Sequence, residues 1–100
     1  MDVMNERPKE KLSGVELFVI DRVLRAIGYS DCYSIIELDE TRDGIRKTDG
    51  GAKYTLYEGF QLLSDILPSS EELAEEYWFN DPEIEIWNNI CTRFMRGDSK

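Results

Sequence analysis

The stretch Cys32-Tyr33-Ser34-Ile35-Ile36-Glu37-Leu38 decides the fold class of this chain. Its aromatic and β-branched residues favour a β-strand. Turn signals follow at Asp43-Gly44 and at Asp49-Gly50-Gly51, and Ala52 to Leu56 is suited to a returning strand. We therefore expect a short antiparallel sheet of two or three strands in the middle of the chain. The alternative is a helix from Asp31 to about Asp39 followed by a long loop, which would make the protein all-α.

A helix is predicted before this stretch by a capping box and an apolar stripe. Ser13 can cap the first free N–H groups, and Glu16 stands three residues later, as a capping box requires. Apolar residues then recur at the helical period, at Leu17, Ile20, Val23, Leu24 and Ile27. Gly28 follows them, and glycine is the residue type that most often ends a helix in the left-handed conformation.

Two helices are predicted directly after the sheet. The first begins at Thr55, where Glu58 completes a second capping box, and it ends at Pro68, which cannot continue a helix. Ser69 and Glu72 form a third capping box at the start of a short helix. The segment that follows the predicted sheet therefore contains clear signals for where each helix begins and ends.

The last helix opens at Asn80, with Asp81 as the predicted cap and Pro82 at the first helical position. With it, the fold class is a helix-dominated α+β domain of about four helices and a small antiparallel sheet or hairpin. We expect one compact domain over residues 12–97, preceded by a mobile N-terminal tail of residues 1–11 and followed by a tail of residues 98–100.

The composition is typical of a globular protein. A length of 100 residues suits one domain, and an apolar fraction of 41% is too high for a disordered chain. No apolar run approaches the roughly 18 residues that a membrane span requires. The N-terminus lacks the basic end and apolar stretch of a signal peptide. We therefore expect a cytoplasmic protein that does not bind a membrane.

The residues needed for common catalytic chemistry are missing. Histidine is absent, which excludes Ser-His and Cys-His nucleophile pairs. The two cysteines, Cys32 and Cys91, have neither metal-type spacing nor a CxxC arrangement, and Cys91 falls on the apolar stripe of the last helix. No Walker loop or dinucleotide fingerprint occurs. We therefore expect no catalytic residues, no cofactor and no enzyme activity.

One short run partly matches a calcium-binding loop. Asp39, Thr41 and Asp43, followed by Gly44, have the spacing of the first ligands of an EF-hand. The bidentate glutamate that closes such a loop is replaced by Gly50. We therefore expect an acidic turn and no metal site.

The net charge belongs to one contiguous segment. The chain has 21 acids and 12 bases, a net charge of −9, and no Lys or Arg occurs from Tyr54 to Thr92. This distribution argues against direct binding to nucleic acid, because a phosphate footprint needs clustered Lys and Arg. It favours a partner protein with a basic surface. The alternative is a solvated acidic face that only maintains solubility.

The candidate partner-binding site is centred on Glu71-Glu72-Leu73-Ala74-Glu75-Glu76-Tyr77-Trp78-Phe79. Its glutamates repel one another at helical spacing, by roughly 0.2–0.5 kcal/mol for each pair. The short helix is predicted to run to about Phe79, and either all three aromatic residues enter the core or one or two are exposed. An exposed aromatic beside carboxylates suits a basic groove with an apolar floor. The predicted site consists of Glu71, Glu72, Glu75, Glu76, Trp78, Asp81, Glu83 and Glu85.

Two function hypotheses follow from these features. The first is a non-enzymatic inhibitor whose carboxylates imitate a row of phosphates and occupy the basic nucleic-acid-binding surface of a host nuclease, CRISPR effector or polymerase. Small, very acidic single-domain chains of this kind recur among phage and mobile-element proteins, and the likeness is one of size and charge. The second is a generic protein–protein interaction module, such as an immunity protein, an antitoxin-like factor or an assembly subunit. The sequence carries no signal for an oligomeric state.

Overall fold

The middle of the chain forms a sheet. In the computed structural model, which describes residues 11–95, β1 (Tyr33–Asp39) and β2 (Arg42–Lys47) pair as an antiparallel hairpin. The short strand β3 (Lys53–Thr55) pairs antiparallel with β2 on its other side. Within the described residues the sheet has the order β1-β2-β3. The predicted small antiparallel sheet is confirmed, and the all-α alternative is wrong.

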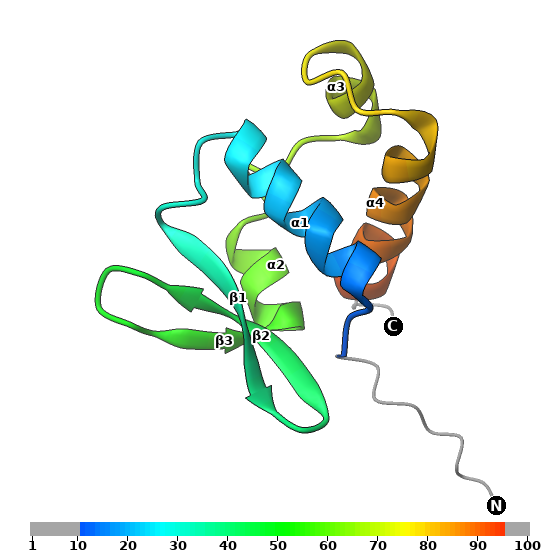
Figure 1. Cartoon of the computed structure of the whole chain (residues 1–100). Helices are drawn as coiled ribbons and strands as arrows, with labels where there is room; N and C mark the ends of the chain where they lie inside the picture. Colours follow the sequence, from blue (N-terminus) through cyan, green and yellow to red (C-terminus); the bar gives the residue numbers. More distant parts are fainter. Residues whose placement is uncertain (1–10, 96–100) are drawn as a thin grey trace, which may run out of the picture.

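Four helices within residues 11–95 complete an α+β fold, as predicted. Helix α1 (Gly14–Ala26) precedes the sheet, and α2 (Leu56–Leu62), α3 (Ser70–Glu75) and α4 (Asp81–Phe94) follow it. The helices lie above and to the right of the sheet in Figure 1, where α1 and α4 are neighbours. None of the helices in this part of the chain is long and apolar enough to cross a bilayer. Apart from Lys11, the predicted tails lie outside the described residues.

The helices begin where their capping boxes predict, with one correction. The boxes Ser13–Glu16, Thr55–Glu58 and Ser69–Glu72 are all present. The predicted cap of α4 is wrong, because Asn80 and not Asp81 occupies that position. The Asn80 side chain accepts a hydrogen bond from the Glu83 N–H at 3.0 Å, and the Glu83 carboxylate accepts one from the Asn80 N–H. Asp81 and Pro82 are therefore the first two residues of the helix.

Two helices are shorter than predicted. Helix α2 ends at Leu62, and the chain continues to Leu67 as a series of turns that still place Leu63 in the core. Ser64 and Asp65 stand at this point, and such residues compete with the helix for backbone hydrogen bonds. Helix α3 ends at Glu75 instead of near Phe79, because the backbone then turns sharply. Gly28 ends α1 as predicted, with a φ of 85°.

The core lies between the helices and one face of the sheet. Helix α1 contributes Val19, Ile20, Val23 and Leu24, so the predicted stripe is displaced to include Val19. Aromatic rings of α2 and α4 pack together, with Phe60 centred 6.0 Å from Trp87 and 5.6 Å from Phe94. Ile45 of β2 is buried against Gly59 of α2, which has no side chain to obstruct it. These contacts fix the sheet to the helical layer.

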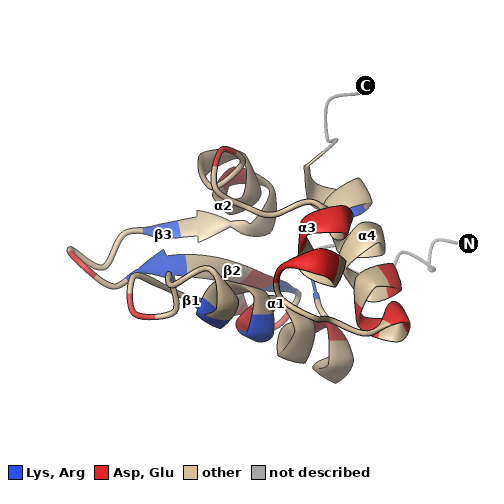
Figure 2. Ribbon diagram, turned by 90° about the horizontal axis from the view of Figure 1, so that it is seen from above, with Lys and Arg blue, Asp and Glu red and all other residues tan. Residues whose placement is uncertain are grey.

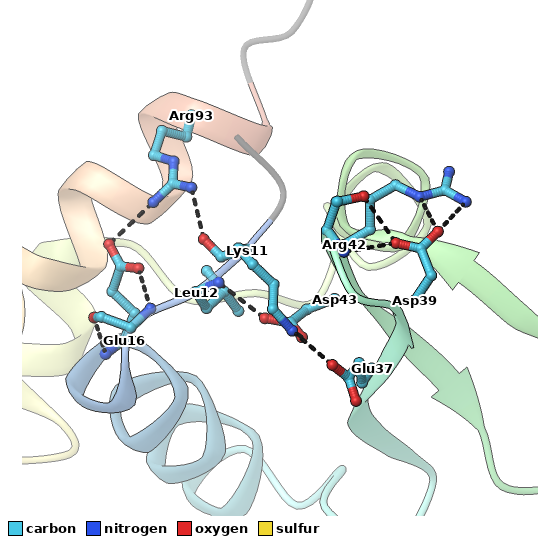
Figure 3. A network of polar contacts seen from close by, with 10 residues as sticks. Lys11, Leu12, Glu16, Glu37, Asp39, Arg42, Asp43 and Arg93 are labelled. Carbon is cyan, nitrogen blue, oxygen red and sulfur yellow. Dashed lines mark hydrogen bonds and ion pairs between the residues drawn. The ribbon is translucent and has the colours of Figure 1, made fainter. Parts of the chain in front are cut away.

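A polar network holds the segment before α1 against the sheet and α4 (Figure 3). The buried carboxylate of Asp43 accepts hydrogen bonds from the Leu12 N–H at 2.8 Å and from Lys11 Nζ at 3.0 Å. Lys11 also contacts Glu37, and the two carboxylates, Asp43 first, raise its pKa. Arg93 of α4 donates to Glu16 and to the Lys11 carbonyl. Lys11, which the sequence analysis assigned to the tail, is thus joined to the fold.

Candidate protein-binding site

Helix α3 is attached to α4 through a few specific contacts. Leu73 is its buried residue, and Ser70 hydrogen-bonds Asn88 of α4 through its hydroxyl group. The Phe79 N–H donates to the Leu73 carbonyl at 3.0 Å, which folds the following loop back over the helix end. This arrangement directs the remaining side chains of α3 to solvent.

The four predicted glutamates of α3 are all exposed. Glu72 has a structural role, because its carboxylate accepts the Ser69 N–H at 2.9 Å. Within residues 11–95, Glu71, Glu75 and Glu76 have no ion-pair or side-chain hydrogen-bond partner. In the ribbon of Figure 2, most of α3 has the red of acidic residues. In the described part of the chain, three of these carboxylates are therefore without a side-chain partner and the fourth caps its helix.

The three consecutive aromatic residues after α3 have three different environments. Phe79 is 6% exposed and lies under the guanidinium of Arg22, which is 4.4 Å from the ring centroid. Tyr77 is half-buried against the core. Trp78 is 83% exposed. Of the two alternatives left open by the sequence, the structure therefore supports one exposed aromatic residue.

Trp78 also has an unfavourable backbone conformation. Its φ is 63°, and no other non-glycine residue in the described chain has a positive φ. A left-handed conformation costs an L-residue with a side chain about 1–2 kcal/mol, and glycine usually occupies the position after a helix for this reason. The exposed indole makes few contacts that could offset this cost. Strained residues of this kind are frequent at functional sites, which makes Trp78 a candidate for one.

The acids at the start of α4 divide into two groups. Asp81 and Glu85 are exposed and, within residues 11–95, have no side-chain partner. Glu83 is different, because one of its oxygens accepts the Asn80 N–H and the other pairs with Arg22 of α1. Its side chain is only 14% exposed. Asp81 and Glu85 are thus exposed acids of α4, the helix that packs against α3, whereas Glu83 joins α4 to α1.

The bases of the described chain are concentrated elsewhere. Figure 2 shows them mainly on the strands and on α1. Arg46 and Lys53 are exposed and stand opposite each other in the β2–β3 register. Among the described residues, therefore, no base forms an ion pair with Glu71, Glu75 or Glu76.

Sequence reasoning missed three exposed apolar side chains. Val15 and Phe18 of α1 are 53% and 55% exposed, and Leu62 at the end of α2 is 50% exposed. Phe18 lies one helical turn before Arg22, the residue that covers the Phe79 ring. The exposure of Phe18 could have been predicted from the sequence, because Phe18 is not on the predicted apolar stripe and a helical residue off that stripe faces away from the core.

The predicted acidic turn does not assemble the ligands of a calcium loop. Asp39 accepts the N–H and hydroxyl of Thr41, both at 2.8 Å, and pairs with Arg42. These interactions, the backbone hydrogen bond first, lower the pKa of Asp39 to about 2. Asp43 instead faces Lys11. Within residues 11–95, no group of three or more Cys, Asp or Glu side chains is arranged to hold a metal ion.

The two cysteines are free and differ in environment. Cys32 is exposed. Cys91 packs beside the core, as predicted from its place on the α4 stripe, and burial raises the pKa of its thiol to about 12.

Comparisons with protein-family models, with curated proteins and with solved structures find no match to this chain.

Proposed function

We propose that this protein is a non-enzymatic inhibitor that binds the basic, nucleic-acid-binding surface of a partner enzyme. The observation that carries the proposal is Trp78, which is 83% exposed in a left-handed conformation and closely follows Glu71, Glu75 and Glu76, three exposed glutamates without a side-chain partner within residues 11–95. An exposed indole among free carboxylates provides an apolar anchor and a ring of negative charge. This combination fits a groove that has an apolar floor and basic walls.

The charge of the molecule supports the phosphate-mimic form of this proposal. Glu71, Glu75, Glu76, Asp81 and Glu85 are exposed acids on two neighbouring helices. Carboxylates fixed on helices can replace several phosphates at once and accelerate encounter with a positive surface. The same charges repel free nucleic acid, so the proposed partner is the enzyme and not its substrate.

A second candidate function is a generic protein–protein module. The exposed Val15 and Phe18 favour it, because apolar side chains on α1 contribute nothing to phosphate mimicry. Binding through them would bury apolar surface and would depend little on salt. Salt dependence and competition with nucleic acid therefore separate the two candidates.

Capture from a nuclease-treated lysate on the immobilised protein tests the proposal. The variant Glu75→Lys/Glu76→Lys reverses two free charges on α3. The control Glu40→Lys/Asp49→Lys makes the same change in net charge at exposed turns of the hairpin and the β2–β3 connection. We expect a nucleic-acid-binding protein that the wild type and the control retain and that the α3 variant loses. Its retention should decrease as salt rises.

Competition then distinguishes mimicry from another mode of binding. Added duplex DNA or RNA should elute the captured enzyme, because both ligands need the same basic surface. A captured protein that nucleic acid does not displace supports the generic module. Equal retention by the wild type and the α3 variant at low salt contradicts any role of the acidic surface in binding.

A further inference from the structure

The face of the sheet that points away from the core carries two exposed bases. Ile45 is buried against α2, so the alternation of side chains along β2 directs Arg46 to the opposite face. Lys53 stands opposite Arg46 in the β2–β3 register and therefore shares that face. Within residues 11–95 neither base has an ion-pair partner, although Asp49 lies in the turn between their strands. In Figure 2, parts of β2 and β3 have the blue of basic residues.

This pair of bases is unfavourable within the monomer. Like charges directly opposite each other on neighbouring strands are destabilising, and the Cβ atoms of such a pair are about 4.5–5.5 Å apart. Arg42, at the other end of β2, differs from them because it forms an ion pair with Asp39 at 2.9 Å. Two carboxylates from outside the monomer, at a similar spacing, would neutralise Arg46 and Lys53 together.

Apolar side chains lie next to these bases on the same face. Ile36 stands opposite Gly44 in the β1–β2 register, and Gly44 is two residues from Arg46. The Leu38 side chain lies over Gly44, because a Cβ on that glycine would be 2.7 Å from it. Ile36 and Leu38 are half-buried, and neither is among the described side chains that pack against the core. The face therefore offers two positive charges and an adjoining apolar surface.

We propose that this face of the sheet binds the acidic surface of α3 in a second copy of the chain. That surface presents matching groups, because Glu71 and Glu75 are exposed, stand four residues apart on one side of α3 and have no side-chain partner within residues 11–95. Cβ atoms at this helical spacing are about 5–6 Å apart, close to the separation of two bases on neighbouring strands. The exposed Trp78 follows them and supplies an apolar group for Ile36 and Leu38.

The combination of charge and apolar surface favours this occupant over nucleic acid. Proteins that bind single-stranded nucleic acid stack its bases on aromatic side chains, and the described residues of this face include none: Ser34, Ile36, Leu38, Gly44, Arg46, Lys53 and Thr55. Two copies of net charge −9 repel each other. Physiological salt screens exposed charges beyond about 8 Å, so the facing groups decide whether the copies associate.

The contact joins two different surfaces, so it is heterologous and can continue from copy to copy. It does not rest on the proposed function, because it needs only the charges and apolar groups of this chain. Self-association and binding of a partner enzyme would use the same acidic surface and would therefore exclude each other.

Analytical ultracentrifugation of the full chain tests the proposal. Exposed ion pairs are weak, so we expect reversible association at roughly millimolar concentration, with a mass that rises beyond the dimer. The variant Arg46→Glu/Lys53→Glu reverses the two bases and keeps one like-charged pair across the strands, so its circular dichroism should not change. It should remain monomeric where the wild type associates. A wild type that remains monomeric, or a variant that associates equally well, overturns the proposal.

Reversal of both surfaces in one chain separates charge pairing from net charge. Glu71→Lys/Glu75→Lys alone should be monomeric, because both surfaces are then basic. All four substitutions together restore opposite charges and the wild-type net charge of −9, since the two double changes cancel, so this chain should associate again. A folded quadruple variant that remains monomeric refutes the pairing of these two surfaces.

The base variant also separates this proposal from the proposed function. Arg46→Glu/Lys53→Glu leaves α3 intact, so it should lose self-association and still capture the partner enzyme from a lysate. Self-association without any captured enzyme contradicts the proposed function alone, and capture by a wild type that never associates contradicts the sheet contact alone.

Discussion

Replacing Trp78 by glycine should leave the fold as stable as the wild type, or make it more stable. The residue has a φ of 63°, so glycine removes a left-handed strain of about 1–2 kcal/mol. Glycine gains freedom in the unfolded chain, which costs about 0.4–1 kcal/mol. An indole that is 83% exposed contributes little burial, so its loss adds only a small term. The expected result lies between no change and a gain of about 1 kcal/mol in the free energy of unfolding.

The assay is urea unfolding followed by circular dichroism and by the fluorescence of Trp87, which stays buried in α4. Trp78→Ala keeps a Cβ in the left-handed conformation, so it should be no more stable than Trp78→Gly. Phe79→Ala is the contrasting variant, because it empties a buried site and removes the ring beneath Arg22. It should cost about 3–5 kcal/mol. A loss of more than about 1 kcal/mol in Trp78→Gly means that Trp78 packs in the fold, and the site argument then fails.

Other measurements test the sheet, the thiols and the acidic turn. Gly44→Ala should lower the free energy of unfolding in urea by about 3 kcal/mol, because its Cβ would lie 2.4 Å from a carbonyl oxygen of β3. Gly14→Ala is the control, since its Cβ would meet no atom within 4 Å, and it should be neutral or slightly stabilising. A thiol-reactive dye at pH 8 should label Cys32 rapidly and Cys91 only on unfolding, because burial raises the pKa of Cys91 to about 12. Fast labelling of the folded Cys32→Ser variant would contradict the buried environment of Cys91. The pKa of Asp39 is lowered from 3.8 to about 2, so its stabilising effect is present above pH 4 and is lost as pH falls toward 2. The stability difference between the wild type and Asp39→Asn should therefore narrow over that interval in thermal unfolding.

Features of the fold set by neighbouring residues could be predicted from the sequence. The capping boxes at Ser13, Thr55 and Ser69 depend on residues three apart, and the structure contains all three. The antiparallel sheet could be predicted because residues that favour β-strands alternate with turn sequences, and the structure contains this sheet. The cap of α4 was misplaced by one residue, because Asn80 and Asp81 are both good caps and local sequence does not choose between them. The Glu83 N–H bonds to Asn80 in the folded helix.

The environment of the candidate site depends on contacts from distant elements, which a one-dimensional pattern does not contain. Three successive aromatic residues do not show which of them enters the core. That choice follows from the turn at Trp78, from Leu73 receiving the Phe79 N–H, and from Arg22 of α1 covering the ring. Glu83 was included in the site for the same reason, because its ion pair with Arg22 joins residues 61 positions apart.

The acids between Tyr54 and Thr92 divide according to whether the fold uses them. Three of them close a capping box at a helix start, where each carboxylate accepts the N–H of the N-cap residue; these are Glu58, Glu72 and Glu83. The others are exposed and have no side-chain partner within residues 11–95, namely Asp65, Glu71, Glu75, Glu76, Asp81 and Glu85. Solubility alone accounts for unpaired acids on a surface. It does not account for an exposed tryptophan among them, because an exposed indole lowers solubility, and its left-handed backbone lowers stability. The proposed binding to a partner would account for both the charge and the indole, and this is the argument for testing it before solubility.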